Sequence, residues 1–162
     1  MTTWNDVTAA APELSKLVQA RFEATGLALL ATLRADGSPR IGGIEPSFWN
    51  GELWLGMMWE SRKALDLRLD PRCALHSATV DKDVKEGDAR VSGRAVEVVD
   101  DATKAAMGAA LAGETGYDPN QDGPWHLFRI DVSELYHLMP GGDHLVIRWW
   151  TPSGGEHRIE RK

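Results

Sequence analysis

The sequence contains a single cysteine, Cys73, among its 162 residues. One cysteine cannot form an internal disulfide, and it cannot supply the several thiolates of a multi-cysteine zinc or iron–sulfur site. No apolar run approaches the roughly 20 residues that a helix needs to cross a bilayer. Residues 1–6 (MTTWND) lack the basic start and apolar centre of a secretory signal. We therefore expect a cytoplasmic protein with no membrane partner.

Basic residues are also fewer than acidic ones: the sequence has 18 Lys and Arg and 24 Asp and Glu, so the formal net charge is −6. A general nucleic-acid binder needs a basic stripe that displaces counterions from phosphates, so this composition argues against nucleic acid as a partner. The chain also lacks a Walker-type loop, a GxGxxG sequence and an HExxH pair. We predict neither classical nucleotide-binding fold and no metal site.

Turn signals divide the chain into short strands and a few helices. The sequences Asp36-Gly37-Ser38-Pro39 and Asn50-Gly51 are typical of hairpins, so we expect the first three strands to form an antiparallel meander. Strands are predicted for residues 27–34, 41–49, 52–59, 73–80, 89–99, 125–132, 144–150 and 157–160. Helices are predicted for residues 12–24, 61–69 and 101–111, with Ser61 and Asp101 as caps and Gly113 ending the third.

About eight short strands with three inserted helices indicate a mainly β (α+β) chain. A closed or nearly closed antiparallel barrel is expected, because closure removes the exposed strand edges of an open sheet. No repeat, low-complexity tract or linker divides the sequence, so we predict one domain over residues 1–162.

The strongest chemical signal is Ser61-Arg62-Lys63 at the start of the second predicted helix. Positive charge in a first turn opposes the helix dipole, and a bound anion would account for it. Free N–H groups, the Ser61 hydroxyl and the two cations would then converge on a phosphate. In the alternative interpretation, Arg62 pairs with Glu60 or Asp66 and Lys63 pairs with Asp66 or with nothing, as a solvated face. Arg40 is a second basic residue, at a hairpin base, where a solubilising role is the usual one.

Several segments taken in order resemble one known family. They are residues 30–40 (LATLRADGSPR), a glycine-rich strand after them, 51–55 (GELWL), 61–67 (SRKALDL), 70–75 (DPRCAL) and 91–95 (VSGRA). This order is similar to that of the pyridoxamine 5′-phosphate oxidase-like, FMN-binding split-barrel superfamily, over roughly residues 12–100. The resemblance implies a six-stranded split antiparallel β-barrel that forms a homodimer, with a flavin-type cofactor in each of two clefts at the subunit interface.

The resemblance also implies which residues bind the cofactor. Arg62 and Lys63 would grip its phosphate, with Ser61 as an additional donor. The second-strand residues Arg40, Ile41, Gly42, Gly43 and Ile44 would run along the ribityl chain and ring, and glycine there permits close backbone approach. Gly56, Met57 and Met58 would line the cofactor with an apolar wall. No catalytic side chain is expected, because the cofactor would carry the chemistry.

Two departures from the family argue against a pyridoxine phosphate substrate. In the vitamin-forming oxidase an Arg-x-His sequence follows a Gly-Gly-acidic-His stretch and holds the substrate phosphate, whereas here residues 141–144 (GGDH) are followed by Leu145, Val146 and Ile147. Met139 stands where that enzyme has a tryptophan against FMN. We therefore predict an oxidoreductase that uses FMN, or coenzyme F420 instead, on a small apolar or conjugated molecule. The alternatives are a non-catalytic flavin or haem carrier and a dimeric barrel without cofactor.

Overall fold

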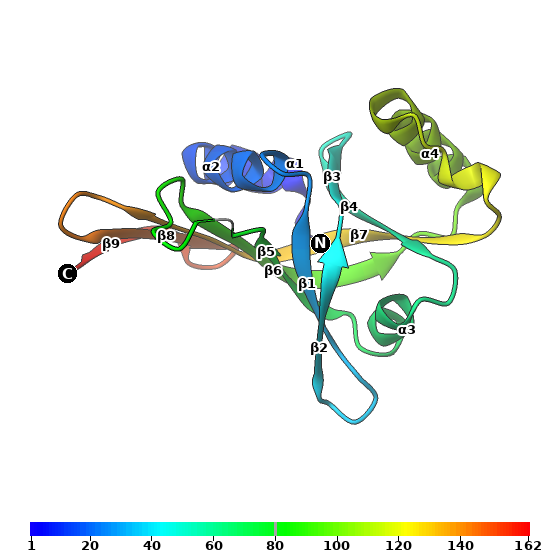
Figure 1. Ribbon diagram of the computed structural model, residues 1–162, viewed down its shortest axis with the longest axis horizontal. Coiled ribbons are helices and arrows are strands. Elements are labelled where there is room, and N and C mark those ends of the chain that lie inside the picture. The colour runs from blue at the N-terminus through cyan, green and yellow to red at the C-terminus, as the bar shows by residue number, and fades with distance from the viewer. Residues whose placement is uncertain (80) are drawn as a thin grey trace.

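The computed structural model describes residues 1–79 and 81–162. The helices are α1 (Trp4–Ala10), α2 (Pro12–Glu23), α3 (Arg62–Leu69), α4 (Asp101–Thr115) and the short 3₁₀ helix η1 (Pro119–Gln121). The strands are β1 (Ala28–Leu33), β2 (Pro39–Ile44), β3 (Pro46–Trp49), β4 (Glu52–Met58), β5 (Arg72–Ser77), β6 (Asp88–Glu97), β7 (Trp125–Pro140), β8 (Leu145–Thr151) and β9 (Gly155–Arg161). Figure 1 shows their arrangement. The predicted strand end at Val80 lies outside the described residues.

The strands pair antiparallel in one continuous sheet with the order β2-β1-β5-β6-β7-β4-β3. The long strand β7 pairs with two different strands along the same edge. Its residues 125–129 pair with β4, and its residues 135–140 pair with β8. The two end strands, β2 and β3, are separated in sequence by Glu45 alone. The chain therefore joins the two edges of the sheet, and the sheet curls into a split barrel, as the sequence predicts.

The predicted meander of the first three strands is wrong. Residues 41–49 do not form one strand, because the chain leaves β2 at Ile44 and begins β3 at Pro46. β2 pairs with β1 at one end of the strand order, whereas β3 pairs with β4 at the other end. Pro46 has no N–H to donate and restricts the backbone of Glu45, so it is a natural point for the chain to change partner. Both predicted hairpins, at residues 36–39 and 50–51, are confirmed, since they join β1 to β2 and β3 to β4.

The predicted limits of the third helix are also wrong. Asp100, not Asp101, caps α4, since its carboxylate accepts a hydrogen bond from the Thr103 backbone N–H at 2.7 Å. The helix passes Gly113 and ends at Gly116, whose φ of +77° is the left-handed conformation that glycine adopts most readily. The first helix, α1, was not expected from the sequence. None of the helices in the described residues combines the length and apolar character that a membrane crossing needs.

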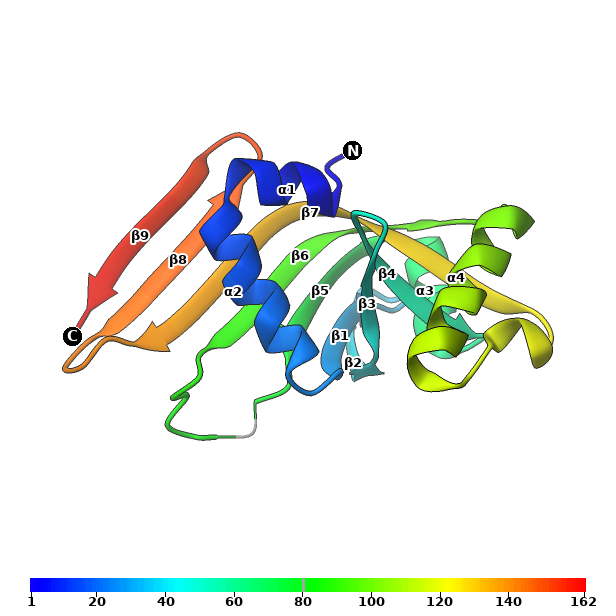
Figure 2. The same cartoon turned by 90° about the horizontal axis from the view of Figure 1, so that it is seen from above.

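The main core lies between α2 and one face of the sheet. Leu14, Val18 and Phe22 fall on one side of α2 and are fully buried. They belong to the same buried cluster as Val91 of β6 and Leu135 of β7. Figure 2 shows α2 lying across β5 to β8. In Figure 1 the helices α1 and α2 lie on one side of this part of the sheet, and no helix of the described residues covers its opposite side.

Candidate functional site

The loop between β4 and α3 presents an unsatisfied polar group at the start of a helix. Ser61 occupies the N-cap position of α3, and its backbone C=O accepts the first helical hydrogen bond from the Leu65 N–H at 3.0 Å. The predicted side-chain cap is absent: within the described residues the Ser61 Oγ is buried and has no hydrogen-bond partner. A buried hydroxyl without a partner carries a desolvation cost. The Ser61 hydroxyl therefore keeps its full hydrogen-bonding capacity.

Neither cation that follows Ser61 forms an ion pair with Glu60 or Asp66 within the described residues, although the alternative interpretation also allowed Lys63 to have no partner. Arg62 is exposed, and within residues 1–79 and 81–162 it forms no ion pair with Glu60 or Asp66. The Nζ of Lys63 donates a hydrogen bond to the Gly43 carbonyl of β2 at 2.6 Å. Burial lowers the pKa of Lys63, and the nearby charge of Glu45 opposes that shift. Arg62 and Lys63 thus leave most of their hydrogen-bonding capacity for a ligand.

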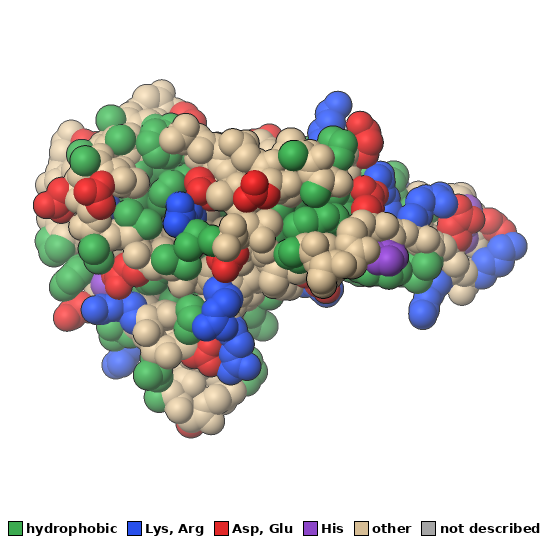
Figure 3. All heavy atoms as spheres, turned by 180° about the vertical axis from the view of Figure 1, so that it is seen from behind, with side chains coloured by type: hydrophobic (Ala, Val, Ile, Leu, Met, Phe, Trp, Pro, Cys, Tyr) green, Lys and Arg blue, Asp and Glu red, His purple; other side chains and the backbone are tan. Residues whose placement is uncertain are grey.

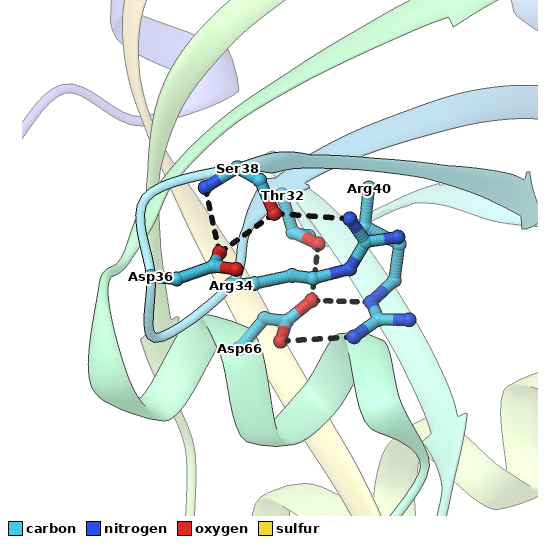
Figure 4. A network of polar contacts seen from close by, with 6 residues as sticks. All are labelled: Thr32, Arg34, Asp36, Ser38, Arg40 and Asp66. Atoms are coloured by element: carbon cyan, nitrogen blue, oxygen red, sulfur yellow. Dashed lines mark hydrogen bonds and ion pairs between the residues drawn. The ribbon is translucent and has the colours of Figure 1, made fainter.

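A polar network beside the cations fixes α3 against the β1–β2 hairpin (Figure 4). The Asp66 Oδ2 accepts hydrogen bonds from Thr32 Oγ1 at 2.8 Å and from Arg40 Nε at 2.6 Å. Burial favours the neutral form of Asp66, but the bonds from Arg40 and Thr32 and the charges of Arg40 and Arg34 outweigh it and hold the pKa below its ordinary value. Arg40 is therefore held in a fixed ion pair rather than being a free solubilising charge.

The same network borders a hollow on the surface. Its volume is about 380 Å³, and its charged lining consists of Arg34, Arg40 and Arg62 with Asp36 and Asp66. The two carboxylates already accept hydrogen bonds, Asp66 from Thr32 and Arg40, and Asp36 from Ser38 at 2.6 Å. Figure 3 shows basic side chains gathered above the tip of the β1–β2 hairpin. The remaining positive charge makes this hollow suited to an anion.

The glycines of β2 leave one stretch of backbone uncovered. A Cβ built on Gly42 or Gly43 would meet no atom within 4 Å, and neither residue has a positive φ. Nothing within the described chain therefore requires glycine at these two positions, and a molecule can approach the backbone closely there. Their neighbours point to opposite sides, since Ile41 is 69% exposed whereas Ile44 is buried in the core.

The predicted site residues of β4 are divided between core and surface. Met57 is buried in the main core, whereas Met58 is 80% exposed. A Cβ on Gly56 would make ordinary contact with the Trp125 ring at 3.4 Å. The hydrogen bond from Lys63 to the Gly43 carbonyl connects the predicted residues of β2 to α3. Of the two methionines, only Met58 has a side chain that a ligand can contact.

The apolar residues Leu145 and Ile147, which follow residues 141–144, lie elsewhere. They belong to β8, together with Trp149. Figures 1 and 2 both place β8 and α3 at opposite ends of the molecule. Within one chain these residues therefore cannot meet a ligand held at α3.

Sequence reasoning missed Asp66 as the partner of both Arg40 and Thr32. Part of this network was predictable, because the Asp36–Pro39 hairpin places Thr32 opposite Arg40 in the β1–β2 register. It also missed His126, whose Nε2 accepts a hydrogen bond from the Glu60 backbone N–H at 3.1 Å. These two residues are 66 positions apart, and no local sequence signal connects them.

Solved structures of similar fold come from several bacteria. PhzG from Burkholderia lata 383, in complex with tetrahydrophenazine-1-carboxylic acid, has a TM-score of 0.69 and 13% identity over 98% of this chain and 95% of its own. A pyridoxamine 5′-phosphate oxidase-related, FMN binding protein from Nostoc punctiforme has a TM-score of 0.64 and 14% identity, covering 94% and 96% of the two chains. HutZ, the heme storage protein from Vibrio cholerae, has a TM-score of 0.55 and 19% identity, covering 76% and 90%.

Sequence comparison gives a more specific result than these fold similarities. No curated protein matches the sequence. Residues 14–139, which include β1 to β6, α3 and nearly all of β7, match the sequence model of one family. Because that match spans most of the chain and contains both the split barrel and the Ser61-Arg62-Lys63 turn, the protein belongs to the pyridoxamine 5′-phosphate oxidase family.

Proposed function

We propose that the protein is an oxidoreductase that binds FMN, or coenzyme F420 in its place, and anchors the cofactor phosphate at the start of α3. The observation that carries this proposal is the buried, partnerless Ser61 Oγ beside two cations that form no ion pair within the described residues. The oxygens of one phosphate would satisfy the hydroxyl and both charges together. The Nostoc relative is an FMN binding protein, which agrees with this assignment.

The residues present fit such a cofactor. Ser61, Arg62 and Lys63 would hold the phosphate, and Arg40 would add positive charge from its fixed position beside Asp66. The cofactor, when bound, supplies the hydride-transfer chemistry of its ring system. The chain would contribute position and exclusion of water. The open backbone of Gly42 and Gly43 would lie against the cofactor.

The rest of the predicted site would complete this binding surface. The exposed Ile41 and Met58 would offer apolar contacts. Gly56, which has no side chain, would leave room beside β4 for the cofactor. The buried side chains of Ile44 and Met57 would pack behind this binding surface, in the core.

We also propose that a second copy of the chain completes the site. Strands β1 and β5 to β8 align one row of residues on the sheet face opposite α2, namely Leu29, His76, Arg90, Tyr136 and Trp149. Leu29 in this row is 49% exposed, and no helix in the part of the chain that the structure describes covers this part of the face (Figure 1). A partner packed there would form the homodimer and would bring its own β8 towards α3. Sedimentation at micromolar concentration should give about twice the mass of the single 162-residue domain.

The substrate would be small and apolar or conjugated, and not pyridoxine 5′-phosphate. By the resemblance to the family, Leu145 and Ile147 would stand where a cation and an imidazole hold that substrate's phosphate. A dianionic phosphate left without partners in a partly dry cleft costs several kcal/mol. Protein loaded with FMN should therefore form no pyridoxal phosphate from pyridoxine 5′-phosphate and oxygen above the free-flavin background.

The phosphate assignment is tested with a double variant, Arg62→Ala with Lys63→Ala. It removes two charge-assisted hydrogen bonds, each contributing about 1.5–3 kcal/mol, so the Kd for FMN should rise at least about a hundredfold. Riboflavin, which lacks the phosphate, should lose far less affinity. The matched control is Lys82→Ala with Lys85→Ala, which removes the same charge from two exposed positions of the β5–β6 loop.

Equal losses for FMN and riboflavin, or an unchanged Kd for FMN, would refute the phosphate assignment. A haem Soret band in the purified protein, with no binding of flavin or deazaflavin, would refute the proposed cofactor class.

A further inference from the structure

The turn that leads into α3 contains a backbone conformation that its residue does not favour. Glu60 has a φ of +53°, in the left-handed region where glycine is the usual residue. The turn is closed by a hydrogen bond from the Ser61 N–H to the Met58 carbonyl at 3.1 Å. A non-glycine residue remains in this region only where its surroundings hold it there. Some contact outside the turn is therefore expected to hold Glu60.

His126 of β7 provides that contact. Its side chain is only 1% exposed, and its Nε2 lies 3.1 Å from the Glu60 backbone nitrogen. An amide N–H can only donate, so Nε2 must be the unprotonated, accepting nitrogen. The other ring nitrogen, Nδ1, lies 2.6 Å from Glu97 Oε1 and carries the proton that it donates to this carboxylate. Glu97 thereby fixes the tautomer in which Nε2 can accept from Glu60.

Further contacts hold the histidine ring and the far end of α3. The indole of Trp59, one residue before Glu60, stacks on the His126 ring with centroids 4.6 Å apart and the planes 6° from parallel. Glu97 also forms an ion pair with Arg68 near the end of α3, at 3.1 Å. Strands β6 and β7 are thus connected to both ends of the helix that carries Arg62 and Lys63.

We propose that His126 is a positioning residue for the anion site, with Glu97 fixing its tautomer. By accepting the Glu60 N–H, His126 maintains the left-handed turn, and the turn determines where Ser61, Arg62 and Lys63 lie. The role in cofactor binding rests on the proposed function, since the ligand of those three residues is taken to be a cofactor phosphate. A histidine that served only as core filling would need its volume but not an accepting atom at Nε2.

Two substitutions separate these roles. In His126→Gln the side-chain oxygen reaches about as far as Nε2 and can still accept from Glu60. In His126→Asn the shorter amide can still donate to Glu97 but does not reach the Glu60 N–H. A third change, Glu60→Gly, makes the positive φ acceptable without a holding contact. Because the Glu60 side chain is exposed, this change leaves the core untouched.

The first measurement needs no cofactor. Amide hydrogen exchange of residues 60–63 is followed in the wild type and both His126 variants, after thermal unfolding has shown that each is folded. Exchange should quicken in His126→Asn and remain close to wild type in His126→Gln. Equal exchange in the two variants would overturn the positioning role, whatever the protein binds.

The second measurement is the Kd of FMN and of riboflavin for the same proteins. His126→Asn should weaken FMN by about 3- to 10-fold and riboflavin by less than about twofold, whereas His126→Gln should weaken neither by more than about twofold. Glu60→Gly added to His126→Asn should restore most of the FMN affinity. Equal losses for both ligands in His126→Asn, or no recovery with Glu60→Gly, would overturn the proposal.

A different result marks failure of the proposed function. If the wild type binds FMN no more tightly than riboflavin, the cofactor-phosphate assignment fails. The exchange data then decide by themselves whether His126 holds the turn.

Discussion

Replacing Asp66 with asparagine should destabilise the fold measurably, because one oxygen of this buried carboxylate joins β1, β2 and α3. It accepts from Thr32 at 2.8 Å and from Arg40 at 2.6 Å. A hydrogen bond to a charged group contributes about 1.5–3 kcal/mol. Asparagine keeps a neutral acceptor, and the Arg40 side chain is 28% exposed to screening solvent, so we expect a loss of about 2 kcal/mol. For a chain of this length that corresponds to a Tm lower by roughly 4–8 °C.

The pH dependence of this difference provides a second check. The folded-state pKa of Asp66 lies below its ordinary value, so the ionised group stabilises the fold above the unfolded-state pKa of about 3.9. The Tm difference between Asp66→Asn and wild type should be full at pH 7 and should disappear as the pH falls through the lower folded-state pKa. Asp83→Asn is the control, since the exposed Asp83 carboxylate makes no bond within the described residues. A Tm change below about 1 °C at pH 7 would refute the reasoning.

Three other residues give direct tests of the fold. Burial raises the pKa of the Cys73 thiol to about 12, so native protein at pH 8 should resist a thiol reagent that reacts at once in denaturant. Burial, followed by the charges of Arg148 and Arg21, lowers the pKa of His137 to about 4. The unfolded state therefore binds the proton more readily, and urea titrations should show the free energy of unfolding falling as the pH drops from about 6.5 towards 4. His137→Gln should not show this part of the pH dependence. A Cβ on Gly93 would collide with the Asp131 carbonyl, so Gly93→Ala should lose about 1–3 kcal/mol of unfolding free energy; an unchanged urea midpoint would contradict the close strand approach.

The parts of the fold that follow from neighbouring residues could be predicted from the sequence. Asn50 and Gly51 both have positive φ in the structure, and the two-residue hairpin that they form was expected from their identity. The start of α3 after Ser61 was likewise predictable, since the signals for a helix end lie within a few residues of it. The change of partner strand at Pro46 was not, because it depends on which distant strand the chain meets next.

The candidate site divides in the same way. The cluster proposed to bind a phosphate could be predicted because Ser61, Arg62 and Lys63 are adjacent in sequence. That Met58 is exposed and Met57 is buried could not be predicted, since the burial along β4 does not alternate strictly. The contact between His126 and Glu60 needs β7 beside the end of β4, and only the folded barrel brings those elements together.

A crystal structure of the protein with FMN would test the central claim most directly. The account predicts the FMN phosphate at the start of α3, with one oxygen within hydrogen-bond distance of the Ser61 Oγ and the others contacted by Arg62 and Lys63. A phosphate bound elsewhere, with the Ser61 hydroxyl still lacking a partner, would contradict the account.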